Sequence, residues 1–319
     1  MSKGSHRGSM QFWPHRRARR ILPRLRKQYS KGKLFNIVTV KAGMTHVMLI
    51  EQAEGPRKNQ EVVVPVTVLE VPETKVYGIR LYKKDSNNYM NSSIDILHRA
   101  TAAELKIKKI KYDESKIDEL INNSDNIERV DLLLYAKIDG TSADINHPIR
   151  YQSSFEYSDI KDALTKARGM LGSKIDIKTL FNPGEYVDVV SISKGKGWQG
   201  PIKRFHVTRQ YRKSTNKVRH VGVLGPMRPG KIFYTVPQAG QLGFNYRTEL
   251  NKQIIGVFSK DEADKVNRKE GFKNYGIIKN DYIMLKGSVP GVAKRIVRIK
   301  QAVRPTKKSV PIKITYIDK

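Results

Sequence analysis

The chain has 319 residues, no cysteine, and a net charge of +31 from 61 Lys/Arg and 30 Asp/Glu. This length allows about two domains, and the lack of cysteine excludes a disulfide framework and a thiolate metal site. No run of about 18 apolar residues predicts a transmembrane helix, and the N-terminal stretch has no apolar segment of the secretory type. We therefore expect a cytoplasmic protein.

The first third of the chain is rich in β-branched residues that alternate with polar ones, a pattern typical of strands. Strands are expected at Phe35–Lys41, Thr45–Glu51, Glu61–Val71 and Val76–Lys83. Gly43 would form a turn between the first two. Pro65 suggests that the third strand lies at a sheet edge or contains a bulge.

The pattern changes after about residue 85. Helical spacing predicts helices at Ala102–Lys111, Ser115–Asn123 and Ser158–Leu171, with Ser158 as the N-cap of the last. Strands are expected at Val130–Ile138, Tyr186–Ser193, Gln253–Phe258, Gly276–Lys286, Lys294–Val303 and Pro311–Ile317. Strands at both ends of the chain predict a mainly β fold, a closed or nearly closed β-barrel interrupted by an α/β insertion.

Charge is segregated along the chain. Residues 51–193 carry 20 basic and 23 acidic residues, whereas residues 1–50 carry 12 basic residues and no acid. Residues 194–260 hold 14 Lys/Arg and one acid, Glu249. Such a stretch cannot bury enough apolar surface to fold alone, and it fits against a polyanion. A near-neutral middle with cationic flanks is typical of a nucleic-acid binder with extended arms.

The segment Gly195–Gly200 formally matches GxGxxG after a predicted strand. A dinucleotide site also needs a following helix and an acid about 20 residues later. We expect Pro201 to prevent that helix, and no acid lies between Asp188 and Glu249. The pattern therefore predicts a flexible, cationic loop that approaches phosphates closely. No histidine or carboxylate pattern in the chain predicts a metal site or catalysis.

Aromatic residues interleave with the cations of this loop: Trp198, Phe205, Tyr211, Phe233, Tyr234, Phe244 and Tyr246. They would either stack on unpaired bases, which suits RNA, or pack in the core. We expect about half to be packing residues. Phe12 and Trp13 pose the same choice beside the N-terminal arginines.

One long spaced pattern carries a family resemblance. From Phe181 the chain reads F-x6-Asp188-x2-Ser191-x-Ser193-x-Gly195-Lys196-Gly197-x2-Gly200-x3-Arg204. This resembles the signature of the universal large-subunit ribosomal protein L-three family at every fixed position. GSMQFWPHRRA, KAGMTH, VPQAGQLGFNYRTELNK and KGSVPGVAKRIV resemble its other landmarks. The α/β insertion resembles the archaeal and eukaryotic branch, and the length suits an archaeon.

The resemblance implies a translation-protein-type β-barrel on the large ribosomal subunit, with an N-terminal extension and a central loop that enter the rRNA toward the peptidyl transferase centre. It implies a role in assembly and near the factor-binding site, neighbouring ribosomal proteins as partners, and no enzymatic activity. The expected parts are the N-terminal extension (1–34), the first part of the barrel (35–84), the α/β insertion (85–178), a barrel strand (179–193), the central loop (194–252) and the rest of the barrel (253–319).

The residues expected to bind rRNA are the cations of both arms with three neighbours of other types. They are Arg16, Arg17, Arg19, Arg20, Arg24, Lys194, Lys196, Trp198, Lys203, Arg204, Arg209, Arg212, Lys213, Lys217, Arg219, His220, Met227, Arg228, Lys231 and Arg247. Many relatives carry Trp at the loop tip, where this chain has Met227, so a Trp-specific role does not transfer.

The alternative function is a free-standing RNA-binding or RNA-chaperone protein. An enzyme would need a catalytic constellation, which the sequence lacks. We expect no membrane partner, no small-molecule substrate and no cofactor beyond structural Mg²⁺ or K⁺ shared with rRNA.

Overall fold

The computed structural model describes the chain in two compact units. The described residues are all except 1–13, 15, 24, 26–34, 51, 53–57, 85–89, 108–116, 118, 120–126, 144, 146, 215–216, 229, 234, 306–309, 311 and 319. We call Met1–Ile21 with Ile192–Arg247 the arm unit, and Leu22–Ser191 with Thr248–Lys319 the body unit.

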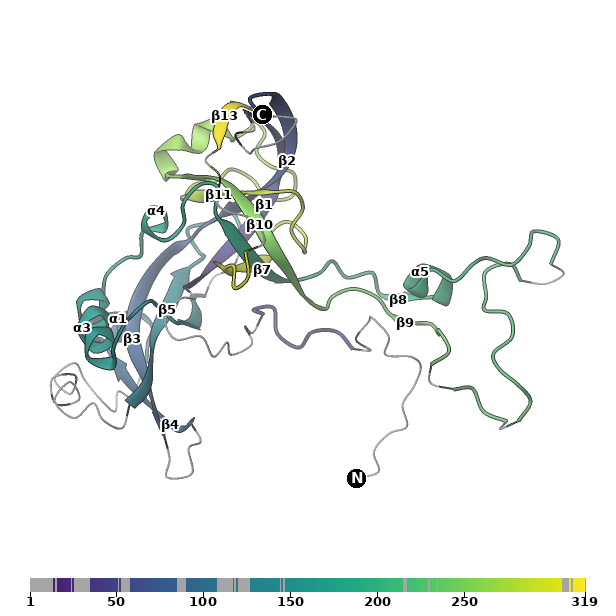
Figure 1. Cartoon of the computed structure of the whole chain (residues 1–319), viewed down its shortest axis with the longest axis horizontal. Coiled ribbons are helices and arrows are strands. Elements are labelled where there is room, and N and C mark those ends of the chain that lie inside the picture. The colour runs from purple at the N-terminus through teal and green to yellow at the C-terminus, as the bar shows by residue number, and fades with distance from the viewer. Residues whose placement is uncertain are drawn as a thin grey trace. The chain divides into compact units, whose positions relative to one another are not determined.

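A seven-stranded sheet is the main element of the body unit (Figure 1). Its order is β12-β7-β10-β11-β2-β1-β13, and β12 also pairs with β1. Six of the strands therefore each have at least two hydrogen-bonded neighbours. The bounds are β1 Asn36–Ile50, β2 Glu61–Glu70, β7 Tyr186–Ile192, β10 Tyr246–Phe258, β11 Tyr282–Lys286, β12 Ile296–Gln301 and β13 Lys313–Ile317.

Both faces of this sheet are buried over much of its area. All six doubly paired strands contribute to one hydrophobic cluster, with Ile37, Leu69, Val189, Ile254, Ile283 and Val297 among its members. Because side chains alternate along a strand, Val38 and Val40 face a second cluster, which continues into the rest of the body unit. Burial on both faces explains the near-continuous apolar runs of these strands.

The second sheet of the body unit has the order β4-β3-β5-β6. Its strands are β3 Glu73–Lys84, β4 Met90–Leu97, β5 Ile127–Lys137 and β6 Ile149–Ser153. The helices α1 (Arg99–Glu104) and α3 (Ile160–Met170) lie beside this sheet, with α1 in contact with β3 and α3 in contact with β5 (Figure 1). The apolar stripe of α3 buries Ala163, Leu164 and Ala167, which join the cluster that also contains Leu132 and Leu134 of β5. The short helices α4 (Ile177–Leu180) and η2 (Lys260–Lys265) complete the described elements of the body unit.

The fold is mainly β, as the strand patterns predicted. The expected strands at Glu61–Val71, Val76–Lys83, Val130–Ile138 and Tyr186–Ser193 are confirmed as β2, β3, β5 and β7, and the helix at Ser158–Leu171 as α3. Strands β4 and β6 were not predicted. The expected helix at Ala102–Lys111 ends earlier, at Glu104 of α1, and its last residues lie outside the described part of the chain. The expected helix Ser115–Asn123 lies almost entirely outside it.

Two expected strands with a turn at Gly43 form one strand instead. β1 runs from Asn36 to Ile50, and the register against β2 shifts between Lys41 and Gly43. A bulge bends a strand without ending it. Gly43 is needed because an added Cβ would lie 2.5 Å from the Phe272 ring. The glycine marks a close approach between side chain and backbone, not a turn.

The strand expected at Gly276–Lys286 begins only at Tyr282. The backbone N–H groups of Lys279 and Asn280 donate to Glu70 Oε1 at 3.0 and 2.9 Å. Groups bound to a carboxylate cannot enter a strand ladder, so the strand starts after them. The strands expected at Lys294–Val303 and Pro311–Ile317 are confirmed in shorter form as β12 and β13.

Pro65 does not place β2 at a sheet edge, because β2 pairs with both β1 and β11. The pairing with β11 ends at Val66, so the missing N–H of Pro65 costs no bond on that side. Ser158 is not the N-cap of α3 either. Asp159 holds that position, and Ser158 bonds Asp162 Oδ2 instead.

Candidate nucleic-acid interface

A short antiparallel ladder joins two segments of the arm unit, residues 193–199 and 240–245, which we call its legs. Strand β8 (Trp198–Gln199) pairs with β9 (Gly240–Gln241). Backbone bonds extend the ladder from Lys196 N to Leu242 O at 3.0 Å and from Ser193 N to Asn245 O at 2.9 Å. The legs are therefore ordered by main-chain hydrogen bonds, and this ordering needs no large apolar core.

Glycine is required at one position of the ladder. Gly243 has φ +75°, and an added Cβ would lie 2.1 Å from the carbonyl oxygen of Lys194. Phe244, the next residue, also has a positive φ of 54°. Two successive left-handed residues turn the chain between β9 and the start of β10.

The expectation that Pro201 prevents a helix is wrong. Helix α5 spans Pro201–Phe205, with Pro201 in its first turn. Proline fits there because its missing N–H would have no partner in a first turn. The helix has only one turn and a half, and it ends at His206 in the left-handed region, so no extended dinucleotide-binding helix forms.

Arg204 connects helix α5 to the chain segment around β9. Its side chain is only 2% exposed. Nε donates to Gln241 O at 3.1 Å, and Nη1 donates to Gln238 O at 3.0 Å. Burial lowers the pKa of Arg204 from its usual value. These contacts give Arg204 a positioning role inside the arm unit, and its expected direct contact with RNA stays a prediction.

The N-terminal segment is held against the start of β10 within the arm unit. Ala18 N donates to Phe244 O at 2.8 Å, Asn245 Nδ2 donates to Arg16 O at 2.9 Å, and the Tyr246 hydroxyl donates to Arg20 O at 3.1 Å. The segment is thus fixed through its backbone, which leaves the arginine side chains exposed.

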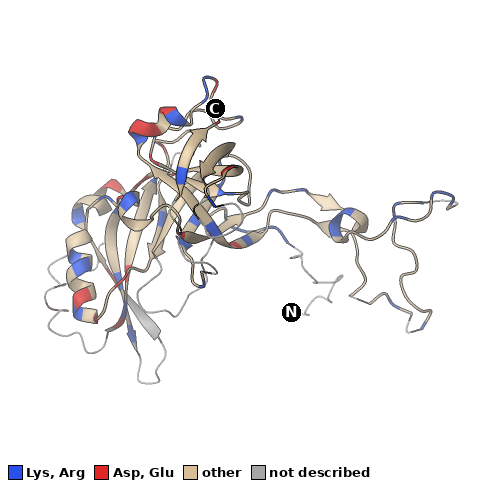
Figure 2. Ribbon diagram, turned by 45° about the horizontal axis from the view of Figure 1, so that its top comes forward, with Lys and Arg blue, Asp and Glu red and all other residues tan. Residues whose placement is uncertain are grey.

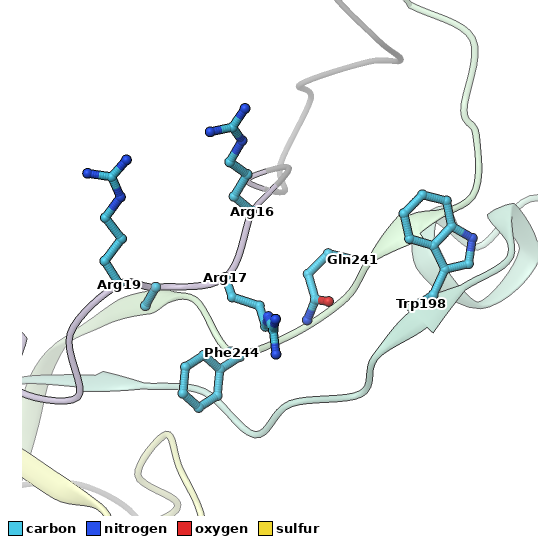
Figure 3. A pocket seen from close by; sticks show the side chains of 7 residues that line it. Arg16, Arg17, Arg19, Trp198, Gln241 and Phe244 are labelled. Carbon is cyan, nitrogen blue, oxygen red and sulfur yellow. The ribbon is translucent and has the colours of Figure 1, made fainter.

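A hollow of about 590 Å³ lies where this segment meets the ladder. Its lining is Arg16, Arg17, Ala18, Arg19, Trp198, Gln241 and Phe244. Figure 3 shows Arg16 and Arg19 extended from the segment, Arg17 directed toward Phe244 and Gln241, and Trp198 at the far side. No carboxylate lines the hollow, and the Trp198 indole is 76% exposed. A cationic hollow with a free aromatic face can bind phosphate and stack a base.

The remaining predicted cations extend over the arm unit, where Figure 2 shows Lys and Arg recurring along the ribbon. Most are exposed: Lys194, Lys196, Lys203, Arg209, Arg212, Lys213, Lys217, Arg219, His220, Arg228 and Lys231. Met227 is 95% exposed. Arg247 is half-buried, and Arg24 lies outside the described residues.

The aromatic residues of the arm unit are more exposed than we expected. Trp198, Tyr211, Phe233 and Tyr246 are exposed, Phe205 and Phe244 are half-buried, and Tyr234 is not among the described residues. The Arg204 guanidinium lies 4.9 Å from the centre of the Phe205 ring. Fewer than half of the described aromatics of this group are therefore packing residues.

Sequence reasoning missed two residues of this site. Gln241 lines the hollow, and Asn245 fixes the N-terminal segment. Both are uncharged amides in a cation-rich stretch, so a search for charge and aromatic character passed over them. The available signal was that each amide stands directly before an apolar or aromatic residue, Gln241 before Leu242 and Asn245 before Tyr246.

Within the described residues, no helix is long and apolar enough to cross a membrane. The same part of the chain brings together no group of three or more His, Cys, Asp or Glu side chains that could hold a metal ion.

Comparison with known proteins agrees with the arrangement. The family model described as ribosomal protein L3 matches residues 1–125 and 137–319. Large ribosomal subunit protein uL3 of Methanothermobacter thermautotrophicus is 36% identical over 98% of this chain and 95% of its own length. The proteins of the same name from Methanocaldococcus jannaschii and Nanoarchaeum equitans are 35% and 37% identical, with the same coverage.

These relatives are archaeal, in agreement with the expected branch. The family consists of structural ribosomal proteins and not enzymes, which confirms the expectation drawn from the missing catalytic constellation. With a signature that begins at Phe181, a family match across almost the whole sequence and archaeal relatives of similar length, the chain belongs to the ribosomal protein L3 family.

Proposed function

We propose that this protein is a structural component of the large ribosomal subunit that binds its rRNA through the arm unit. The observation that carries the proposal is the ladder of the arm unit, which holds exposed cations and exposed aromatics without a single acid between Asp188 and Glu249. Twelve Lys and Arg lie in residues 192–247. Neutralisation of phosphates by such a surface, with release of counterions, supplies much of the free energy of RNA binding.

The finer features rest on the family. We propose a role in subunit assembly and in the region near the peptidyl transferase centre and the factor-binding site, with neighbouring ribosomal proteins as partners. The cation-rich arm unit is consistent with contacts deep in RNA. No organic cofactor is required, and any Mg²⁺ or K⁺ would be shared with rRNA phosphates.

We also propose that the body unit is a closed barrel of the translation-protein type. Two observations support this. Six strands each pair with at least two neighbours, and all six contribute to a single cluster. Closure removes the unpaired strand edges that would otherwise promote aggregation.

Sedimentation tests the proposed function. Lysate separated on a gradient should place the chain in the large-subunit peak, and washing at moderate salt should leave it there. Free migration at moderate salt would contradict the proposal. It would favour the alternative of a free-standing RNA-binding or RNA-chaperone protein, which exchanges on and off RNA with a steep salt dependence.

A further inference from the structure

The hollow of the arm unit is open and cationic, and it has room for one small ligand. Its volume of about 590 Å³ lies within the range of pockets that hold small molecules. Three arginines line it, and no carboxylate is among the lining residues. In the described part of the chain, no carboxylate forms an ion pair with Arg16, Arg17 or Arg19. Their charge is therefore available to an external anion.

Trp198 and Gln241 face the hollow from the same side of the ladder. They are directly paired across β8 and β9, and side chains of a cross-strand pair project on one face. The two side chains therefore form a unit, a flat aromatic surface beside a carboxamide. Figure 3 shows both of them at the hollow.

The Gln241 carboxamide has a fixed orientation. Its Nε2 donates to Leu242 O at 3.2 Å and to Gly243 O at 3.1 Å. Both partners are carbonyl oxygens, which only accept, so a flipped amide would place oxygen against oxygen. No described donor bonds Oε1. In Figure 3 this oxygen lies on the Trp198 side. The chain thus presents one oriented acceptor beside the indole.

We propose that this hollow binds a single unpaired nucleotide of RNA, with its base stacked on Trp198 and its amino group donating to Gln241 Oε1. The inference rests on the proposed function and specifies one subsite of it. Arg16, Arg17 and Arg19 would neutralise the phosphates on either side of the nucleotide. Stacking is tolerant of sequence, so the oriented acceptor supplies the selectivity.

The geometry favours bases that carry an exocyclic amine, adenine among them, over uracil. An acceptor rewards a base with an exocyclic amine, and uracil has none. Purines also offer a larger stacking surface than pyrimidines. Uracil can offer Oε1 only its ring N–H, and a uracil carbonyl turned toward Oε1 would leave two acceptors facing each other. Adenine and guanine each provide both the larger stacking surface and the amine.

The experiment uses the full chain with Trp13→Phe, which leaves Trp198 as the only tryptophan. Short uridine oligonucleotides with and without one central adenosine are titrated at fixed salt, with tryptophan fluorescence and RNA anisotropy as readouts. We expect quenching of Trp198 and roughly 2- to 10-fold tighter binding of the adenosine oligonucleotide, which corresponds to one hydrogen bond.

Two changes test the acceptor. Gln241→Met should lower the adenosine-to-uridine affinity ratio to the preference that purine stacking on Trp198 provides by itself. The matched control is Gln199→Met, on the neighbouring strand position, whose amide also donates to a backbone carbonyl, Lys196 O, but does not line the hollow. The control should keep the ratio. An oligonucleotide with purine riboside in place of adenosine lacks the amine, so it should keep the stacking preference and lose the part that the hydrogen bond provides, without any change to the protein.

Trp198→Ala should weaken binding by about 5- to 150-fold, as loss of one stacked base does. Its control is Tyr316→Ala, an exposed aromatic on β13. If the parent binds RNA but shows no adenosine preference, or purine riboside binds as tightly as adenosine, the proposed nucleotide site is wrong and the proposed function stands. If the parent neither binds RNA nor sediments with the large subunit, the proposed function itself fails.

Discussion

The residues that carry the family resemblance have mainly structural contacts. Phe181 is almost fully buried in the cluster shared by the six strands. Asp188 accepts from Asn251 N at 3.1 Å and pairs with Lys300 at 3.4 Å, both inside the body unit. Ser191 Oγ donates to Ile296 O at 3.0 Å. These residues of the spaced pattern therefore stabilise the fold, and they do not themselves form the exposed cationic surface.

Glu70 is the buried acid on which a loop of the body unit depends. It is fully buried, and it accepts from Lys279 N, Asn280 N, Asn280 Nδ2 and the Tyr275 hydroxyl. We expect Glu70→Ala to lower the free energy of unfolding by about 3–5 kcal/mol, because it leaves buried donors without a partner. Urea denaturation measures the loss. Glu61→Ala, at the exposed other end of β2, should change stability by less than about 0.5 kcal/mol.

The same cluster predicts a loss of stability at alkaline pH. Burial, followed by the neighbouring Glu70 charge, raises the pKa of Tyr275 well above its usual value. The unfolded chain releases this proton above pH of about 10, whereas the folded chain retains it. The contribution of Tyr275 to the free energy of unfolding is therefore fully present below that pH and is lost progressively as the pH rises above it. Tyr275→Phe should show a shallower decrease between neutral and alkaline pH in thermal unfolding. An equal slope in both proteins would contradict the assignment.

At the scale of elements, the sequence predicted type better than extent. Strong β-branched runs gave the correct strands, and the amphipathic stripe gave α3. The errors arose where a distant group captured the backbone. Glu70 shortens the strand that ends at Lys286, and the β1 bulge replaces a turn at Gly43. Glu70 is far in sequence from Lys279 and Asn280, and Phe272 is far from Gly43. No local sequence pattern could therefore reveal either contact.

The legs of the arm unit give a prediction at this scale. We expect Gly243→Ala to loosen the ladder by roughly 1–3 kcal/mol, because alanine must adopt a positive φ and its Cβ would collide with Lys194 O. Hydrogen exchange at Leu242 N and Lys196 N, both bonded across the ladder, measures the effect. Gly200→Ala is the matched control, since Gly200 has open space around it and no positive φ. Equal exchange in both variants would contradict the steric argument.

At the scale of the molecule, the two units differ in what stabilises them. The body unit buries large hydrophobic clusters, whereas the arm unit depends on backbone ladders and on Arg204. We therefore expect the body unit to fold without the arm. The six-part division of the chain expected from the sequence stays a prediction.

Shortening the arm tests this independence. Residues 200–239 are replaced by Asn-Gly, a two-residue turn that suits the paired ends Gln199 and Gly240. Circular dichroism should show an intact cooperative transition of the body unit. Nine Lys/Arg are lost, so the slope of log affinity for rRNA against log salt should become shallower, by at most about 6–8. Loss of the transition would show that the arm is part of the core.

The sequence alone determined the family, the mainly β class and the cationic arms, because these depend on composition, on short-range periodicity and on a long spaced motif. It also placed most of the cations that the structure finds exposed in the arm unit. Tertiary structure decided how they are presented. The burial of Arg204, the attachment of residues 16–20 beside Phe244 and the fixed amide of Gln241 all depend on the local path of the folded backbone. Such contacts follow from the course of the chain in space, which local propensity does not specify.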